Sequence, residues 1–137
     1  MTTAVWDASA LLFVLRKEPG WEAFAAKLEG GAISTVNLSE VATKLLEVGG
    51  TSEKTRQVLT ELPLEVHDFT SDLAYRAATL REPTRALGLS LGDRACLALG
   101  LSLGSPVLTA DRIWRRLTVG VEIVLVRGAK AAEEDHP

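Results

Sequence analysis

Four acidic residues stand where elements of secondary structure are expected to meet: Asp7, Glu40, Asp93 and Asp111. Asp7 and Asp111 each follow a short apolar strand pattern, whereas Glu40 and Asp93 fall in the first turns of expected helices. Carboxylates gathered at one place repel one another. Hard divalent cations such as Mg²⁺ or Mn²⁺ are the natural counter-charge, and the chemistry they support with phosphate substrates is hydrolysis of a phosphodiester.

Each acid also has an ordinary structural explanation. Glu40 is the third residue after Asn37 and could close a capping box, and Asp93 stands in the same relation to Ser90. Asp111 could simply face the positive end of the next helix, and the first acid could cap a turn. Only the expected convergence of all four acids favours a functional site over these local roles.

Short apolar strands alternate with amphipathic helices around the acids. We expect strands over 4–6, 32–36, 64–66, 106–109 and 121–126, and helices over 10–17, 21–28, 37–48, 52–62, 70–86, 90–103 and 111–117. Pro83 should kink or break the helix that contains it. This alternation predicts an α/β fold with three layers and a mostly parallel central sheet. Such sheets bind ligands beyond the carboxyl ends of their strands.

The segment LSLGDRACLALG, residues 89–100, should place one acid, Asp93, at the start of a buried helix. Ser90 is its expected N-cap, and the residues that follow Asp93 are small and apolar on almost every face. A side chain at Gly92 would crowd the metal and the substrate. We therefore expect Gly92→Leu to impair activity more than stability.

Composition sets further bounds. The chain has 137 residues, a formal net charge of −3 and one cysteine, Cys96. Bulk positive charge therefore cannot attract a polyanion, and the single buried thiol fits a reducing cytoplasm. We expect no signal peptide and no membrane span, one domain over 1–127 and a flexible tail over 128–137. His67 and His136 are expected to have no catalytic role, and no zinc cluster or phosphate-binding glycine loop is present.

Four segments form a pattern: VWDAS at 5–9, NLSEV at 37–41, LSLGDRACLAL at 89–99 and LTADRIW at 108–114. Their order and spacing closely resemble the PIN domain family, and in particular the VapC toxins of bacterial toxin–antitoxin modules. The resemblance extends from residue 3 to about residue 126. It implies an endoribonuclease that depends on Mg²⁺ or Mn²⁺, with the four acids as its site.

The resemblance also assigns roles within the site. It implies that Asp7, Asp93 and Asp111 bind metal, directly or through water, and that Glu40 is a ligand or orients the attacking water. Thr109 matches the family's hydroxyl beside the last acid. Two further polar residues that match positions supporting the first and second acids are Ser9 and Asn37.

The family suggests partners as well: a homodimer, and a VapB-like antitoxin whose C-terminal segment lies in a groove near the site. The residues expected to line that groove are Leu11, Leu12, Leu15, Trp21, Phe24, Leu45 and Leu46, and ordinary core packing is the alternative for about half of them. Arg112, Arg115 and Arg116 could contact RNA phosphates or form a solvated helix face.

Three other functions remain to be weighed. A receiver-like phospho-acceptor domain also gathers acids at strand ends, but it needs paired acids after an early strand and a lysine after a late one, and neither occurs here. A catalytically silent module that only binds an antitoxin, and a PIN nuclease directed at DNA, stay open, because metal-assisted hydrolysis does not itself recognise a 2′-hydroxyl.

Overall fold

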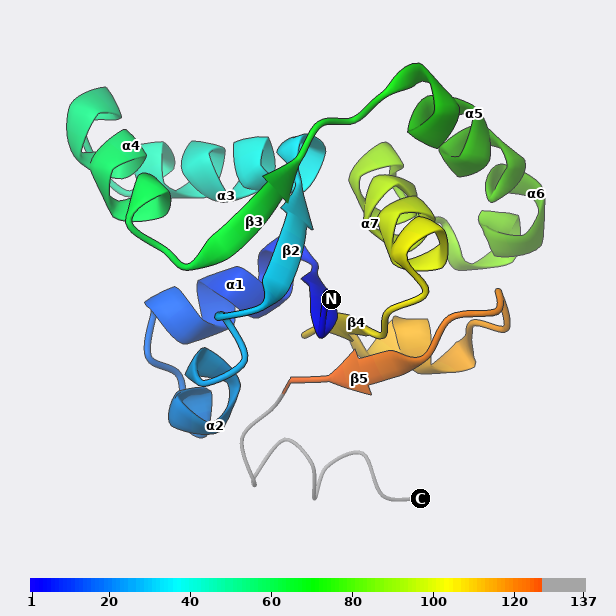
Figure 1. Ribbon diagram of the computed structural model, residues 1–137, viewed down its shortest axis with the longest axis horizontal. Helices are drawn as coiled ribbons and strands as arrows, with labels where there is room; N and C mark the ends of the chain where they lie inside the picture. The colour runs from blue at the N-terminus through cyan, green and yellow to red at the C-terminus, as the bar shows by residue number, and fades with distance from the viewer. Residues whose placement is uncertain (127–137) are drawn as a thin grey trace.

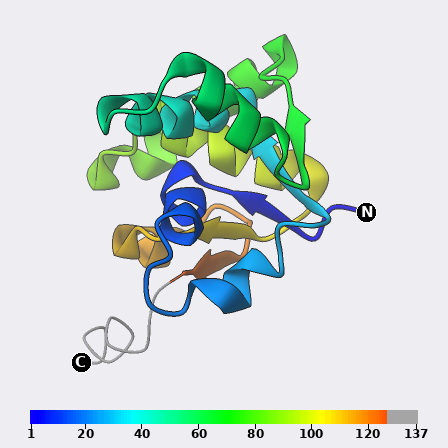
Figure 2. The same ribbon diagram turned by 90° about the vertical axis from the view of Figure 1, so that its left-hand side faces the viewer.

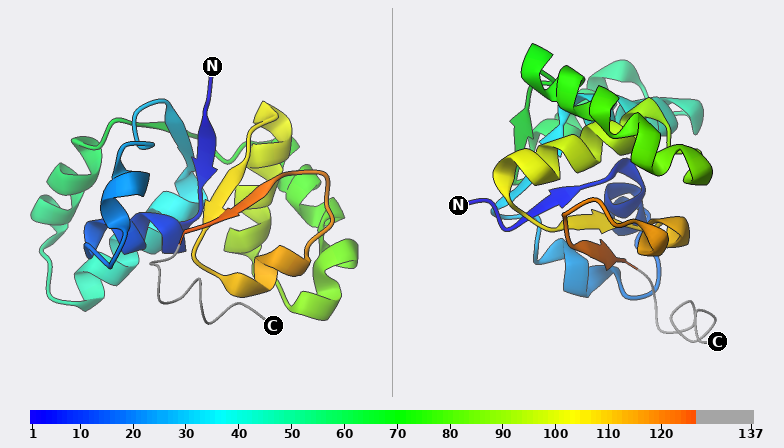
Figure 3. Two further views of the ribbon diagram at one scale, coloured as in Figure 1. Left: turned by 90° about the horizontal axis from the view of Figure 1, so that it is seen from below. Right: turned by 90° about the vertical axis from the view of Figure 1, so that its right-hand side faces the viewer.

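A computed structural model describes residues 1–126 and contains a five-stranded sheet within that range. The strands are β1 (Ala4–Trp6), β2 (Gly31–Ser34), β3 (Leu64–His67), β4 (Val107–Thr109) and β5 (Ile123–Leu125). Their order is β3-β2-β1-β4-β5, and every neighbouring pair is parallel. Figure 3 (left) shows β1 between β2 and β4. The expected parallel α/β fold is confirmed.

Helices cover both faces of this sheet (Figures 1 and 2). One face carries α1 (Ala8–Leu15), α2 (Trp21–Ala25), α3 (Thr35–Glu47) and α4 (Ser52–Thr60). The other carries α5 (Ser71–Thr79), α6 (Arg81–Thr84), α7 (Leu91–Leu103) and two 3₁₀ helices, η1 (Arg85–Leu87) and η2 (Arg112–Arg116). The chain moves outward from β1 to β3 in one direction and from β4 to β5 in the other. Because crossovers between parallel strands are right-handed, the two sets of helices fall on opposite faces.

Two apolar cores follow from the alternation of side chains along the strands. In β1, Ala4 and Trp6 pack with α1 and its neighbours, whereas Val5 packs on the opposite face with α7. Small residues let α7 approach the sheet closely, and its residues 95–100 are all buried. This helix is therefore held as a core element from which its first turn projects to the sheet edge.

Several boundaries differ from those expected from sequence. The segment 70–86 is divided into α5, α6 and η1, because Pro83 has no N–H to continue the helix. The second strand ends at Ser34, whose hydroxyl accepts a hydrogen bond from Val36 N at 3.2 Å, so α3 starts at Thr35 and not at residue 37. The expected flexible tail, 128–137, lies outside the described residues. Within residues 1–126, no helix has the length and apolar character needed to cross a membrane.

Gly100 tests the packing of α7 on the sheet. A Cβ at this position would lie 2.6 Å from Cγ2 of Val107 in β4. Replacing a helical glycine with alanine normally stabilises a helix by about 1 kcal/mol. We expect Gly100→Ala instead to destabilise the protein by about 1–3 kcal/mol because of overpacking, as measured by urea unfolding. Ser102→Ala on the exposed face of the same helix is the control, and an equally stable Gly100→Ala variant would contradict this packing.

Candidate functional site

The candidate site lies where the strand order reverses. The chain leaves β1 toward β2 and returns to the opposite side of β1 as β4, so the carboxyl ends of β1 and β4 flank the switch point of the sheet. Asp7 directly follows β1, and Asp111 follows β4 by two residues. Crevices at such points are the usual ligand sites of open α/β sheets.

Asp7 is a buried carboxylate held by two hydroxyl groups. Its side chain is only 5% exposed. Ser9 Oγ donates to Asp7 Oδ2 at 2.5 Å, and Thr109 Oγ1 donates to the same oxygen at 3.0 Å. The two hydroxyl oxygens in turn accept hydrogen bonds from the backbone N–H groups of Ala110 (2.9 Å) and Asp111 (3.1 Å). These bonds join the segment after β1 to the segment after β4.

The electrostatic environment of Asp7 shows which acids are close to it. Burial is the largest influence and raises the pKa of Asp7 from 3.8 to about 6. The bonds from Ser9 and Thr109 lower it, and the negative charges of Asp93 and Glu40 raise it further. Burial, and then the charges of the same three acids, raise the pKa of the Cys96 thiol, which keeps this buried cysteine neutral. Asp7, Glu40 and Asp93 are thus brought together electrostatically.

Glu40 is positioned by contacts between α3 and α7. Asn37 is fully buried inside α3, and its Nδ2 donates to Glu40 Oε1 at 2.8 Å and to the carbonyl oxygen of Gly92 at 3.0 Å. A Cβ on Gly92 would collide with the Glu40 carboxylate. The capping-box explanation for Glu40 is wrong, because the N-cap of α3 is Ser34 and Asn37 lies within the helix.

Asp93 has the local role that the sequence suggested and a place in the site as well. Ser90 Oγ accepts from Asp93 N at 3.2 Å, and Asp93 Oδ2 accepts from Ser90 N at 2.9 Å, which completes a capping box at the start of α7. The side chain remains half-buried. One carboxylate therefore stabilises the helix start while its charge acts on Asp7.

Asp111 lies at the margin of this cluster. It is exposed and caps η2 by accepting from Ile113 N at 3.1 Å, whereas the charges that raise the pKa of Asp7 are those of Asp93 and Glu40. Across residues 1–126, no three side chains of the Asp, Glu, His and Cys types are arranged closely enough to hold a metal ion by themselves. Three acids are therefore within electrostatic reach of one another, and the fourth is tied to them through Thr109.

Three features of the site nevertheless fit a hard divalent cation. The available donors are carboxylate oxygens, which suit Mg²⁺ and Mn²⁺. The charges on Asp7, Glu40 and Asp93 oppose one another and would be offset by a cation. Asn37 Oδ1, beside the Glu40 carboxylate, is buried without a hydrogen-bond partner.

The remaining predicted residues are divided between surface and core. Arg112, Arg115 and Arg116 are exposed on η2, directly after the fourth acid. Leu11 and Leu12 are core residues, as the alternative of ordinary core packing predicts. Four others are partly buried against the same core: Leu15, Trp21, Phe24 and Leu45. Leu46 alone among the seven predicted groove residues is largely exposed, at 44%.

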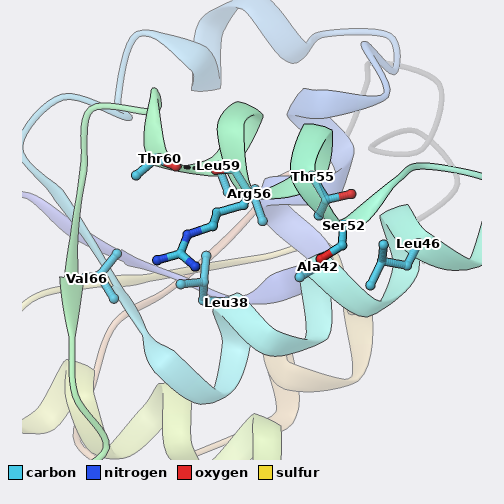
Figure 4. A pocket seen from close by; sticks show the side chains of 9 residues that line it. All are labelled: Leu38, Ala42, Leu46, Ser52, Thr55, Arg56, Leu59, Thr60 and Val66. Carbon is cyan, nitrogen blue, oxygen red and sulfur yellow. Dashed lines mark hydrogen bonds between the residues drawn. The ribbon is translucent and has the colours of Figure 1, made fainter.

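An apolar groove of about 430 Å³ lies instead between α3, α4 and β3 (Figure 4). Figure 4 shows the Arg56 side chain extending across it between Leu38 and Val66. Sequence reasoning missed this groove, although it included one of its residues, Leu46, in the predicted partner groove. The sequence signal that could have revealed it is the recurrence of apolar residues every four positions along α3, where the groove is lined by Leu38, Ala42 and Leu46.

Comparisons with known proteins agree with this architecture. The model of the PIN domain family matches residues 4–120. No curated protein sequence matches the chain. The chain is similar to a DNA-bound VapBC from Salmonella typhimurium (TM-score 0.72, 22% identity, 90% of this chain and 98% of that one). It is also similar to Mycobacterium tuberculosis VapC20, a Sarcin-Ricin loop cleaving toxin (0.69, 16%, 88% and 99%), and to a toxin-antitoxin complex from Klebsiella pneumoniae (0.67, 21%, 88% and 100%).

The raised pKa of Asp7 predicts a pH dependence of stability in metal-free buffer. Between pH 3.8 and about 6 the folded protein holds the Asp7 proton more tightly than the unfolded chain does. The free energy of unfolding should therefore fall as pH rises through this window, by a total of about 3 kcal/mol. Asp7→Asn removes this loss, so it should be the more stable protein at pH 7.5, and the difference should shrink to below about 1 kcal/mol at pH 4.

Urea unfolding with EDTA at the two pH values measures this effect. Asp72→Asn is the matched control, because Asp72 is an exposed acid in the first turn of α5. An Asp7→Asn variant less stable than the parent protein at both pH values would contradict the assigned environment of Asp7.

Proposed function

The chain belongs to the PIN domain family, and we propose that it is a metal-dependent endoribonuclease, the toxin of a VapBC-type toxin–antitoxin pair. The observation that carries this proposal is the electrostatic coupling of Asp7, Glu40 and Asp93 at the switch point of the sheet. Like charges held close together in a partly buried site destabilise a fold, and a bound ligand of opposite charge offsets this cost. The RNA substrate is supported by the similarity to the Sarcin-Ricin loop cleaving toxin VapC20.

The proposed metal ligands are Asp7, Asp93 and Asp111, directly or through water, and the cation is Mg²⁺ or Mn²⁺. The chemistry that such a cation supplies when bound is neutralisation of charge at the phosphate and a lower pKa for water. Glu40 is held by Asn37 beside Gly92, where it can bind the cation or orient the attacking water and accept its proton. Water adds to phosphorus, the bond to the leaving oxygen breaks, and that oxygen takes up a proton.

Substrate and partner surfaces complete the proposal. The exposed Arg112, Arg115 and Arg116 would contact RNA phosphates beside the acids. The partner is a VapB-like antitoxin, a proposal supported by similarity to toxin–antitoxin complexes. The α3–α4 groove offers an apolar surface to such a partner, in place of the buried Leu11 and Leu12. We further propose a homodimer of one PIN domain per chain over residues 1–127, acting on RNA in the cytoplasm.

Cleavage of a single-stranded RNA tests the proposed chemistry. We expect cleavage with Mg²⁺ or Mn²⁺, none with EDTA, and a loss of about 100-fold or more in Asp7→Asn and Asp93→Asn, because each removes a charge on which the cation depends. Asp72→Asn, at a comparable position in a helix first turn, should cut RNA at the parental rate. A matched single-stranded DNA separates an RNA enzyme from a DNA nuclease. Folded Asn variants that cut as fast as the parent would refute the mechanism.

Substitution of Gly92 tests whether this glycine positions the Glu40 carboxylate or only allows close packing. We expect Gly92→Ala to lower kcat/KM about tenfold or more by displacing the Glu40 carboxylate, and to change the free energy of unfolding by no more than about 1 kcal/mol. Gly100→Ala should do the reverse, because its Cβ meets an apolar side chain away from the acids. If Gly92→Ala lost stability and cleavage in step, the glycine would serve packing alone.

A further inference from the structure

The two hydroxyl groups that hold Asp7 lie 3.2 Å from each other, and both contact the same carboxylate oxygen. Each of Ser9 and Thr109 has one proton, which it donates to Asp7 Oδ2. Each hydroxyl oxygen is also fixed by a backbone N–H, from Ala110 and Asp111 respectively. A hydroxyl with its proton and an acceptor position both engaged cannot rotate away without breaking two hydrogen bonds. Oδ2 of Asp7 is therefore committed to the protein.

One oxygen of each of the other two coupled acids accepts a single hydrogen bond. Glu40 Oε1 accepts from Asn37 Nδ2, and the second proton of that amide goes to the carbonyl oxygen of Gly92. Both partners are acceptors, so only the NH₂ group of Asn37 can face them. Asp93 Oδ2 accepts from the backbone N–H of Ser90 at the helix start.

The second oxygen of each acid has no such partner. Within residues 1–126, Asp7 Oδ1, Glu40 Oε2 and Asp93 Oδ1 accept no hydrogen bond. The site consequently presents three acids with one available oxygen each.

Cations differ in how they use carboxylates. Ca²⁺ takes about 6–8 oxygen ligands and often binds both oxygens of one carboxylate, whereas Mg²⁺ keeps an octahedral set of about six, with several waters. We infer that Ser9, Thr109 and Asn37 are specificity-determining residues: by holding one oxygen of Asp7 and of Glu40, they restrict each acid to a single oxygen and favour Mg²⁺ or Mn²⁺ over Ca²⁺. This inference rests on the proposed function and concerns the choice of cation.

Calorimetric titration with MnCl₂ and CaCl₂, without RNA, measures the preference between the two cations directly. We expect the parent protein to bind Ca²⁺ about tenfold or more weakly than Mn²⁺. The variant Ser9→Ala/Thr109→Val frees Asp7 Oδ2 and keeps the acid. It should reduce the ratio of the two dissociation constants at least about threefold, because a second oxygen then becomes available to the larger cation.

The matched control removes similar hydroxyls elsewhere in the core. Ser105 and Thr84 are buried and donate to backbone carbonyl groups, so Ser105→Ala/Thr84→Val should leave the ratio unchanged. Asn37→Ala frees Glu40 Oε1 and should lower the ratio like the hydroxyl variant. Circular dichroism establishes folding, and Thr109→Val alone replaces the double variant if that variant does not fold.

The outcomes separate this inference from the proposed function. A reduced ratio in both Asn37→Ala and the hydroxyl variant supports it. An unchanged ratio in folded variants that still bind Mn²⁺ overturns it and leaves the proposed nuclease intact. If the parent protein binds neither cation, the proposed metal dependence fails, and the inference fails with it.

Discussion

The structure depends on one buried carboxylate, that of Asp7, which directly follows the central strand β1. Burial penalises the ionised form of Asp7, and the charges of Glu40 and Asp93 add to the penalty. Hydrogen bonds from Ser9 and Thr109 offset part of this cost. The same hydroxyls bind the backbone after β4, so the contacts that stabilise the acid also fix the segment leading to Asp111. The same hydrogen bonds therefore hold the proposed site and connect the segment after β1 to the segment after β4.

Close packing of α3 against α7 serves the site in a similar way. Asn37 links the two helices, and the lack of a side chain at Gly92 lets the Glu40 carboxylate lie against the first turn of α7. Capping and site chemistry are compatible, since Asp93 uses one oxygen to complete the capping box and retains the other. Asp93 therefore serves as a capping residue and also belongs to the proposed site.

The sequence predicted most of the fold and the general position of the acids. It misjudged the start of α3, because the β-branched residues Thr35 and Val36 favour a strand when read alone. The Ser34 hydroxyl ends the strand by capping the helix, which moves Asn37 from a cap to an interior position where it can cross to α7. The expected partner surface also differs from the observed one, because the apolar side chains of α1 pack in the core.

Periodicity, capping signals and the order of the acidic segments are local properties, and they were sufficient to predict an α/β fold of the PIN type and to single out the four acids as candidates. Contacts between residues about a hundred positions apart, such as that between Ser9 and Thr109, were decided only by the tertiary structure. The reason is that the neighbours of a strand depend on the sheet order, here β3-β2-β1-β4-β5, which no local pattern specifies. That order determined which acids meet, which of their oxygens the protein holds, and where a groove remains open.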